Sequence, residues 1–116
     1  MAKPIASSKF PDKSFDVVFT NAVLIYIGPD KIENIIKNML RISRRALVLM
    51  ECHAFAPLKD ENGTGAYYGG LWIKDYAILL KRFVPEDRIK VSKIPVDLWP
   101  GEPWLTYGAV VEVAVV

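Results

Sequence analysis

Three side chains able to take part in proton transfer or nucleophilic chemistry stand together after an apolar run. Glu51, Cys52 and His53 directly follow residues 46–50, a pattern typical of a buried strand. His53 is the single histidine of the chain, and its titration range suits a general base near neutral pH. We predict Glu51 and His53 as catalytic residues. The alternatives are that His53 is an ordinary hydrogen-bonded group and that Glu51 caps a helix or pairs with an arginine.

A second polar step follows an apolar run near the start of the chain. Residues 15–20 are predicted to form a short buried strand that opens at Thr20 and Asn21 into polar sequence. In an open parallel sheet, ligands bind in the crevice beyond the carboxyl ends of the strands. The segment from Thr20 to Tyr26 is therefore the first place to look for a binding site, although a core strand and a plain turn would produce the same pattern.

The segment between these strands predicts an amphipathic helix. Asp30 is expected to be its N-cap, with Glu33 three residues later as the capping-box partner. Strand, helix and strand then form a right-handed crossover, which brings both polar strand ends to one edge of a sheet. The apolar positions share one helix face, and they are Ile32, Ile35, Ile36, Met39 and Leu40.

A long loop and a second helix are expected next. Loops as long as residues 54–69 are usually functional or disordered. Tyr67 and Tyr68 in this loop are predicted to bind substrate by stacking on a planar group, with the alternative that they pin the loop to the protein body. Residues 71–83 predict a helix whose outer face carries Lys74.

Two further strands complete the predicted sheet. Residues 88–95 alternate in polarity, and residues 107–116 are strongly β-branched. Trp99 and Trp104 in the connector between them are expected to cover an open end of the core. Residues 1–9 lack periodicity and are expected to be a flexible lead-in to a single α/β domain over residues 10–116.

Composition narrows the classes of function. With 52% hydrophobic residues, the chain is too apolar for disorder and suits strands covered on both faces. The net charge is +2 and the basic residues are scattered, which argues against a nucleic-acid partner.

Cys52 is the single cysteine, which excludes an intrachain disulfide and a multi-cysteine zinc site. No run approaches the roughly 20 apolar residues that span a membrane. We expect a cytoplasmic protein without a metal site or membrane partner.

The run Phe-Pro-Asp-Lys-Ser-Phe-Asp-Val-Val-Phe-Thr-Asn-Ala-Val-Leu-Ile-Tyr-Ile at residues 10–27 resembles the fourth-strand motif of class I S-adenosylmethionine-dependent methyltransferases of the type 11 kind. The next helix, the strand over residues 45–51 and the helix opening near residue 73 keep that family's order. The resemblance covers the C-terminal half of the family's domain. It implies a partial Rossmann-like α/β sheet of about four strands in family order 4-5-7-6, with the last strand antiparallel and with two main helices.

The resemblance also implies site residues and a cofactor. The main chain around Thr20, Asn21 and Ala22 would lie against the methionine portion of S-adenosylmethionine. Tyr26 stands where this family often faces the cofactor or substrate, and we predict it as substrate-binding. The family's glycine-rich cofactor loop and the acidic residue of its second strand lie upstream of the matched half. Residues 63–65 do not replace that loop, because G-x-G-x-x-G would need glycine at Tyr68.

Two hypotheses remain from the sequence. One is a methyltransferase-like protein that lacks the glycine-rich loop, is inactive alone and is completed by a separate N-terminal half. The other is a non-catalytic dimeric α/β module that binds a small ligand or a protein. In either case residues 15–20 are expected to form an open, apolar edge strand that pairs with another chain, as a two-fold homodimer or with the N-terminal half. The methyl acceptor is not indicated.

Overall fold

A four-stranded sheet forms the centre of the protein in the computed structural model, which describes residues 10–55, 66–68, 70–95 and 97–115. Its strands, in spatial order, are β1 (Phe15–Asn21), β2 (Ser43–Cys52), β6 (Gly108–Ala114) and β5 (Ile89–Lys93). β1 and β2 are parallel, whereas β6 runs antiparallel to both of its neighbours. The predicted fold class, the predicted strand order and the antiparallel last strand are confirmed.

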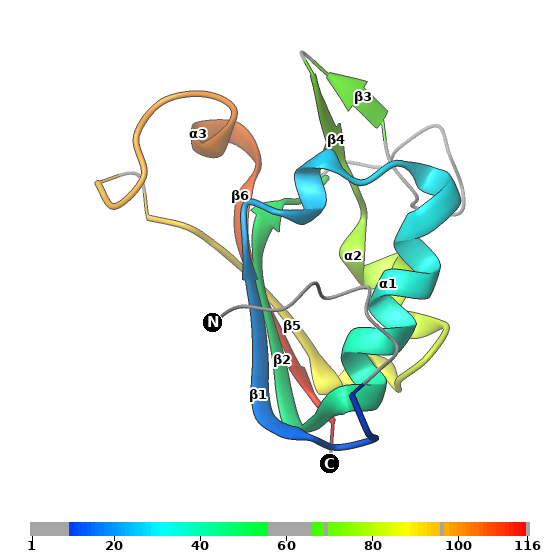
Figure 1. Cartoon of the computed structure of the whole chain (residues 1–116). Helices are drawn as coiled ribbons and strands as arrows, with labels where there is room; N and C mark the ends of the chain where they lie inside the picture. Colours follow the sequence, from blue (N-terminus) through cyan, green and yellow to red (C-terminus); the bar gives the residue numbers. More distant parts are fainter. Residues whose placement is uncertain (1–9, 56–65, 69, 96, 116) are drawn as a thin grey trace.

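Both main helices lie on one side of this sheet (Figure 1). They are α1 (Pro29–Ile42) and α2 (Tyr76–Lys81), and the core forms between them and the sheet. The predicted apolar face of α1 is confirmed, because Ile32, Ile36 and Met39 are fully buried. Among the described residues, no helix is long and apolar enough to cross a membrane.

The opposite face of the sheet keeps apolar side chains exposed. Alternation along β1 points Phe15, Val17 and Phe19 away from the helices, and Phe19 is 68% exposed. The predicted burial of residues 15–20 is therefore wrong, because Thr20 is the one fully buried residue of β1. β1 is also an edge strand, since β2 is its single neighbour within the described sheet. An exposed apolar face beside a free strand edge is the kind of surface on which another strand can pair.

The start of α1 differs from the prediction. Gly28 is the N-cap and has no side-chain cap, and Pro29 is the first helical residue, where its fixed φ suits a helix. Asp30 therefore lies inside the first turn and favours the helix dipole instead of capping. Glu33 forms an ion pair with Arg82, so the predicted capping box is wrong.

The second helix is shorter than predicted. Residues 71–73 form strand β4 (Leu71–Ile73), which pairs antiparallel with β3 (Ala66–Tyr68). α2 begins after Asp75, whose carboxylate accepts a hydrogen bond from the Ile78 N–H at 3.1 Å. This side-chain cap decides where the helix starts. Of the predicted loop, residues 56–65 and 69 lie outside the described residues, as do residues 1–9 of the predicted lead-in.

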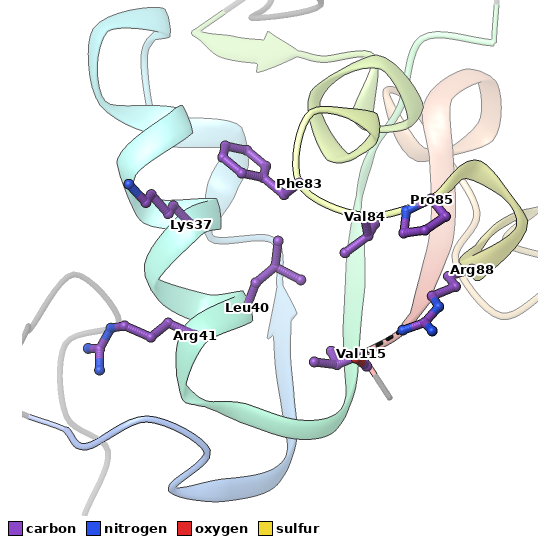
Figure 2. A pocket seen from close by; sticks show the side chains of 8 residues that line it. All are labelled: Lys37, Leu40, Arg41, Phe83, Val84, Pro85, Arg88 and Val115. Atoms are coloured by element: carbon purple, nitrogen blue, oxygen red, sulfur yellow. Dashed lines mark hydrogen bonds between the residues drawn. The ribbon is translucent and has the colours of Figure 1, made fainter.

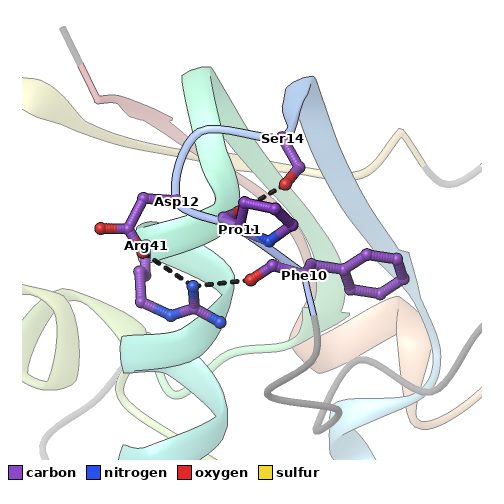
Figure 3. Close-up of polar contacts among 5 residues, drawn as sticks. All are labelled: Phe10, Pro11, Asp12, Ser14 and Arg41. Carbon is purple, nitrogen blue, oxygen red and sulfur yellow. Dashed lines mark hydrogen bonds and ion pairs between the residues drawn. The ribbon is translucent and has the colours of Figure 1, made fainter.

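The turn before β1 is attached to the end of α1 by Arg41 (Figure 3). Its guanidinium donates to the Phe10 carbonyl oxygen and to Asp12, both at 2.8 Å. The Lys13 N–H donates to the Arg41 carbonyl oxygen at 2.9 Å, and Ser14 donates to the Pro11 carbonyl oxygen. These contacts fix the point at which the chain enters the sheet.

Two short helices precede the last two strands. They are the 3-10 helix η2 (Glu86–Arg88) before β5 and α3 (Trp104–Tyr107) before β6.

Aromatic side chains close the other end of the sheet. Trp104 packs against a buried cluster that includes Ile25, Cys52 and Ile73. Trp99 stacks on Trp104 with ring centroids 4.3 Å apart. Trp104 therefore covers this end of the core, as expected. Trp99 stacks on Trp104 and is not among the residues packed against the buried cluster.

Candidate functional site

The carboxyl ends of β1 and β2 meet at one edge of the sheet, as the crossover predicts. Asn21 lies beside Met50, and the Ala22 N–H donates to the Met50 carbonyl oxygen at 3.0 Å. The chain turns at Ala22, which has a left-handed φ of 56°, and continues into a 3-10 turn, η1 (Leu24–Tyr26). A left-handed alanine is strained, so surrounding contacts must hold this turn in place.

Glu51 supplies most of those contacts. One carboxylate oxygen accepts hydrogen bonds from the Thr20 hydroxyl at 2.7 Å and from the Val23 N–H at 3.1 Å. The other accepts from the Ile25 N–H at 3.2 Å. The Glu51 side chain is fully buried. The carboxylate therefore satisfies the backbone of η1, whose first N–H groups have no partner within the turn.

Burial raises the pKa of the Glu51 carboxyl, while the hydrogen bonds from Thr20 and from the η1 backbone pull it down. Charge-assisted hydrogen bonds of this kind are stronger than neutral ones. Each carboxylate oxygen accepts a hydrogen bond from the backbone of the turn, so Glu51 stabilises the conformation of η1.

Lys74 is the residue that sequence reasoning missed. The helical period assigned to residues 71–83 placed it on the outer face, yet it lies between β4 and α2 with no exposed surface. Its Nζ donates to the Leu24 carbonyl oxygen at 2.6 Å and to the Trp72 carbonyl oxygen at 3.4 Å. Burial lowers the pKa of the ammonium to about 8, although the Glu51 charge acts in the opposite direction. Lys74 and Glu51, which we call the anchor pair, hold η1 through its carbonyl and its N–H groups.

His53 is buried beyond the end of β2. Its Nδ1 accepts a hydrogen bond from the Tyr76 N–H at 3.2 Å, which requires the tautomer with hydrogen on Nε2. Its ring lies near Phe55 and Tyr76. Burial lowers the pKa of the imidazole, against the raising effect of Asp75. The basic nitrogen is therefore occupied by a backbone donor, and no hydrogen bond joins His53 to Glu51 in the described part of the chain.

The Cys52 thiol is poorly placed for nucleophilic chemistry. Cys52 is fully buried, and burial together with the Glu51 charge raises the pKa of the thiol to about 11. A neutral buried thiol is a poor nucleophile. The described residues hold no group of three or more side chains able to ligate a metal ion.

Exposed aromatic side chains lie on the elements beside the anchor pair. Tyr26 at the end of η1 is 67% exposed, and Tyr67 on β3 is 65% exposed. Tyr67 packs edge-on against Trp72 of β4 at 5.1 Å, and β4 lies beside η1 (Figure 1). Trp72 covers Gly28, where an added Cβ would come within 3.7 Å of its Nε1. The side chain of Tyr68 is outside the described part of the structure.

A groove of about 340 Å³ lies at the other end of β2, between α1 and the segment after α2 (Figure 2). Arg88 closes one end by donating to the Val115 carbonyl oxygen at 3.2 Å. The charged ends of Lys37 and Arg41 point away from the hollow in Figure 2. The floor is apolar and consists of Leu40, Phe83, Val84, Pro85 and Val115. None of the predicted site residues is among those that line it.

Comparison with known proteins identifies the fold. No protein-family model matches the sequence, and no curated protein does. The chain is similar to the solved structure of a SAM-dependent methyltransferase from Methanosarcina mazei, at 18% identity and a TM-score of 0.54, covering 97% of this chain and 63% of that one.

Two further solved structures are similar. Magnesium protoporphyrin IX methyltransferase from Synechocystis, solved with bound SAH, matches at 15% identity and a TM-score of 0.59, over 98% of this chain and 49% of that one. A protein from Pyrococcus horikoshii matches at 10% identity and a TM-score of 0.57, over 98% and 57%. The chain therefore has a class I methyltransferase-like fold and spans between 49% and 63% of the length of these structures.

The role of the Glu51 carboxylate can be tested by Glu51→Gln. The amide would turn an N–H donor toward backbone N–H groups and would leave Lys74 buried without its counter-charge. We expect the free energy of unfolding, measured in urea, to fall by about 3 kcal/mol. The matched control Glu112→Gln, at an exposed position of β6, should change it by less than about 0.5 kcal/mol. Equal effects of the two variants would contradict the anchoring role.

The burial of His53 predicts a pH dependence. Its pKa is lowered from 6.5 in the folded protein, so the unfolded chain binds more protons just below pH 6.5. The free energy of unfolding should therefore decrease as the pH falls through 6.5 and stop decreasing once the folded pKa is passed. Nuclear magnetic resonance of the imidazole protons measures that pKa directly. A folded pKa at or above 6.5 would show that the ring is hydrated or charge-paired.

Proposed function

We propose that residues 10–115 are the acceptor-side part of an S-adenosylmethionine-dependent methyltransferase. In this proposal the chain does not bind the cofactor alone and is inactive alone. A glycine-rich segment outside residues 1–116, on the same or another polypeptide, completes the cofactor site. The proposal is supported by the class I methyltransferase-like fold together with one observation: the turn after β1, where the ligand crevice of such a sheet lies, is held by the buried anchor pair.

The proposed cofactor contacts follow from this position. The main chain of Thr20, Asn21 and Ala22 would lie against the methionine portion of S-adenosylmethionine. Thr20 is buried and bonded to Glu51, and Asn21 is exposed at the strand end. The strained φ of Ala22 turns the chain out of the sheet at this point. A rigid main chain at a binding site keeps the geometry that positioning requires.

Positioning is also the role that we propose for Glu51 and His53. Methyl transfer from a sulfonium is a displacement that depends largely on holding donor and acceptor in line. Glu51 shapes η1, and His53 fixes the start of α2 through the Tyr76 N–H. These contacts leave neither side chain free as a general base in the present arrangement.

The acceptor would be bound by aromatic side chains. We propose Tyr26 and Tyr67 as substrate-binding residues, with Trp72 as a third, and Tyr68 by its place in β3. Tyr26 and Tyr67 are exposed, and Trp72 is partly buried against Tyr67. Such rings suit a planar or apolar acceptor, because they bury a large area with little loss of side-chain entropy.

The completing segment would join at β1. β1 is an edge strand of the described sheet, its side chains Phe15, Val17 and Phe19 are exposed, and its carboxyl end leads into the proposed cofactor contacts. A strand added to β1 would extend the sheet and place new backbone at the same crevice. We propose a cytoplasmic location, which suits the free thiol of Cys52.

Calorimetric titration with S-adenosylhomocysteine tests this proposal. The folded chain alone should give no saturable heat at millimolar ligand. A mixture of the chain with a segment that carries the glycine-rich loop and associates with β1 should show one-site binding near micromolar affinity, or about 8 kcal/mol. Micromolar binding by the chain alone would overturn the missing-loop proposal. An associated mixture that binds no cofactor would overturn the methyltransferase proposal.

A second candidate is a non-catalytic dimeric module, and it is favoured by the same open edge. Two copies of β1 pairing about a two-fold axis would join two four-stranded sheets and cover Phe19. Light scattering at micromolar concentration should then give a dimer, and Phe19→Lys should give a monomer. The control Leu98→Lys, at a 73% exposed position outside the sheet, should remain dimeric. A monomeric wild-type chain would exclude this candidate.

A further inference from the structure

The anchor pair places two opposite charges inside the protein at a single turn. Lysine and glutamate are almost never fully buried unless they are paired. Here Glu51 meets the N–H groups of η1 and Lys74 meets its Leu24 carbonyl oxygen. Tyr26 follows the two anchored residues Leu24 and Ile25 directly, so the position of its ring depends on how η1 is held.

We infer that Lys74 is a positioning residue for Tyr26, and that the proton on its amine sets how firmly η1 is held against the sheet. The part of this inference that concerns the acceptor rests on the proposed function. The anchoring of η1 by Lys74 is a property of the chain alone. Lys74 contacts backbone and no reacting atom, so it acts through the turn.

The sign of the proton's effect follows from linkage. The pKa of Lys74 is about 8 when η1 is closed and returns toward its ordinary 10.5 when opening exposes the amine to water. The open state therefore binds the proton more tightly than the closed state. Protonation favours opening, and raising the pH through 8 favours the closed turn.

Few neighbouring groups interfere in this pH range. Glu51 and Cys52 act on the Lys74 ammonium, and the Cys52 thiol has a pKa of about 11. Burial lowers the pKa of His53 and raises that of Tyr76 well above 10. Lys74 is thus the member of this buried cluster that titrates between pH 7 and 9.5. The other charged or ionisable groups reach this cluster through its members: Asp75 acts on His53, and Glu102 acts on Cys52.

Hydrogen exchange of the Val23 and Ile25 amides tests the inference in the wild-type chain. After correction for intrinsic exchange, their protection should rise about tenfold between pH 7 and 9.5. At the higher pH the open state gains less free energy from binding a proton at Lys74, so opening becomes less favourable. Titration of the Lys74 side chain by carbon resonance should give a pKa near 8. A Lys74 pKa near 10.5, or protection that does not change with pH, would overturn the inference.

Variants separate this role from general stability. Lys74→Met should abolish the pH dependence of protection and shift the Tyr26 ring resonances. Tyr76→Phe alters the adjoining buried residue, and Lys37→Met removes an exposed lysine from α1. Both controls should keep the pH dependence and the Tyr26 resonances of the wild type. If they change Tyr26 as Lys74→Met does, Lys74 has no specific positioning role. These readouts need no cofactor, so they can fail or succeed independently of the proposed function.

Discussion

The carboxylate of Glu51 holds the turn that follows β1, and the arrangement of the whole candidate site depends on this contact. The turn starts at a strained alanine, Ala22, and continues into a single 3-10 turn whose backbone groups need partners once they are buried. Glu51 accepts from its N–H groups, and Lys74 donates to its carbonyl. Because Glu51 lies near the end of β2 and the turn follows the end of β1, these bonds also join the carboxyl ends of the two parallel strands.

The cost of this arrangement is two charges without exposed surface. Removing either residue should lower the free energy of unfolding, because the other charge would stay buried without its partner. Apolar residues of similar volume often pack such a space as favourably, whereas this protein keeps two buried charges beside η1. We interpret this as a requirement for fixed geometry at η1. The sheet face away from the helices is different, because apolar side chains such as Phe19 remain exposed there.

Periodicity predicted the parts of the fold that depend on one segment. The apolar stripe of α1 and the extended conformation of β1 and β2 follow from local patterns, and the structure agrees with them. The burial of β1 was predicted wrongly, because an apolar run does not show whether anything covers its outer face, and Phe15, Val17 and Phe19 are exposed. The predicted start of α2 was wrong. The apolar spacing continues back to residue 71, but Asp75 caps the helix and makes it begin after Lys74. Glu51 was noticed for its place after a strand, but a sequence does not show which N–H groups will face a carboxylate across space. Lys74 was missed for the same reason, since its partner Leu24 lies 50 positions away.

The most direct test of this account is a correlation across the hydrogen bonds themselves. A long-range amide-to-carbonyl experiment on isotope-labelled protein detects scalar coupling between an amide nitrogen and the carbon of the group that accepts its hydrogen bond. The account predicts cross-peaks from both Val23 and Ile25 to the side-chain carboxyl carbon of Glu51. Absence of both, with amides that exchange at the rate of an unstructured chain, would show that η1 is not held by this carboxylate and would contradict the central claim.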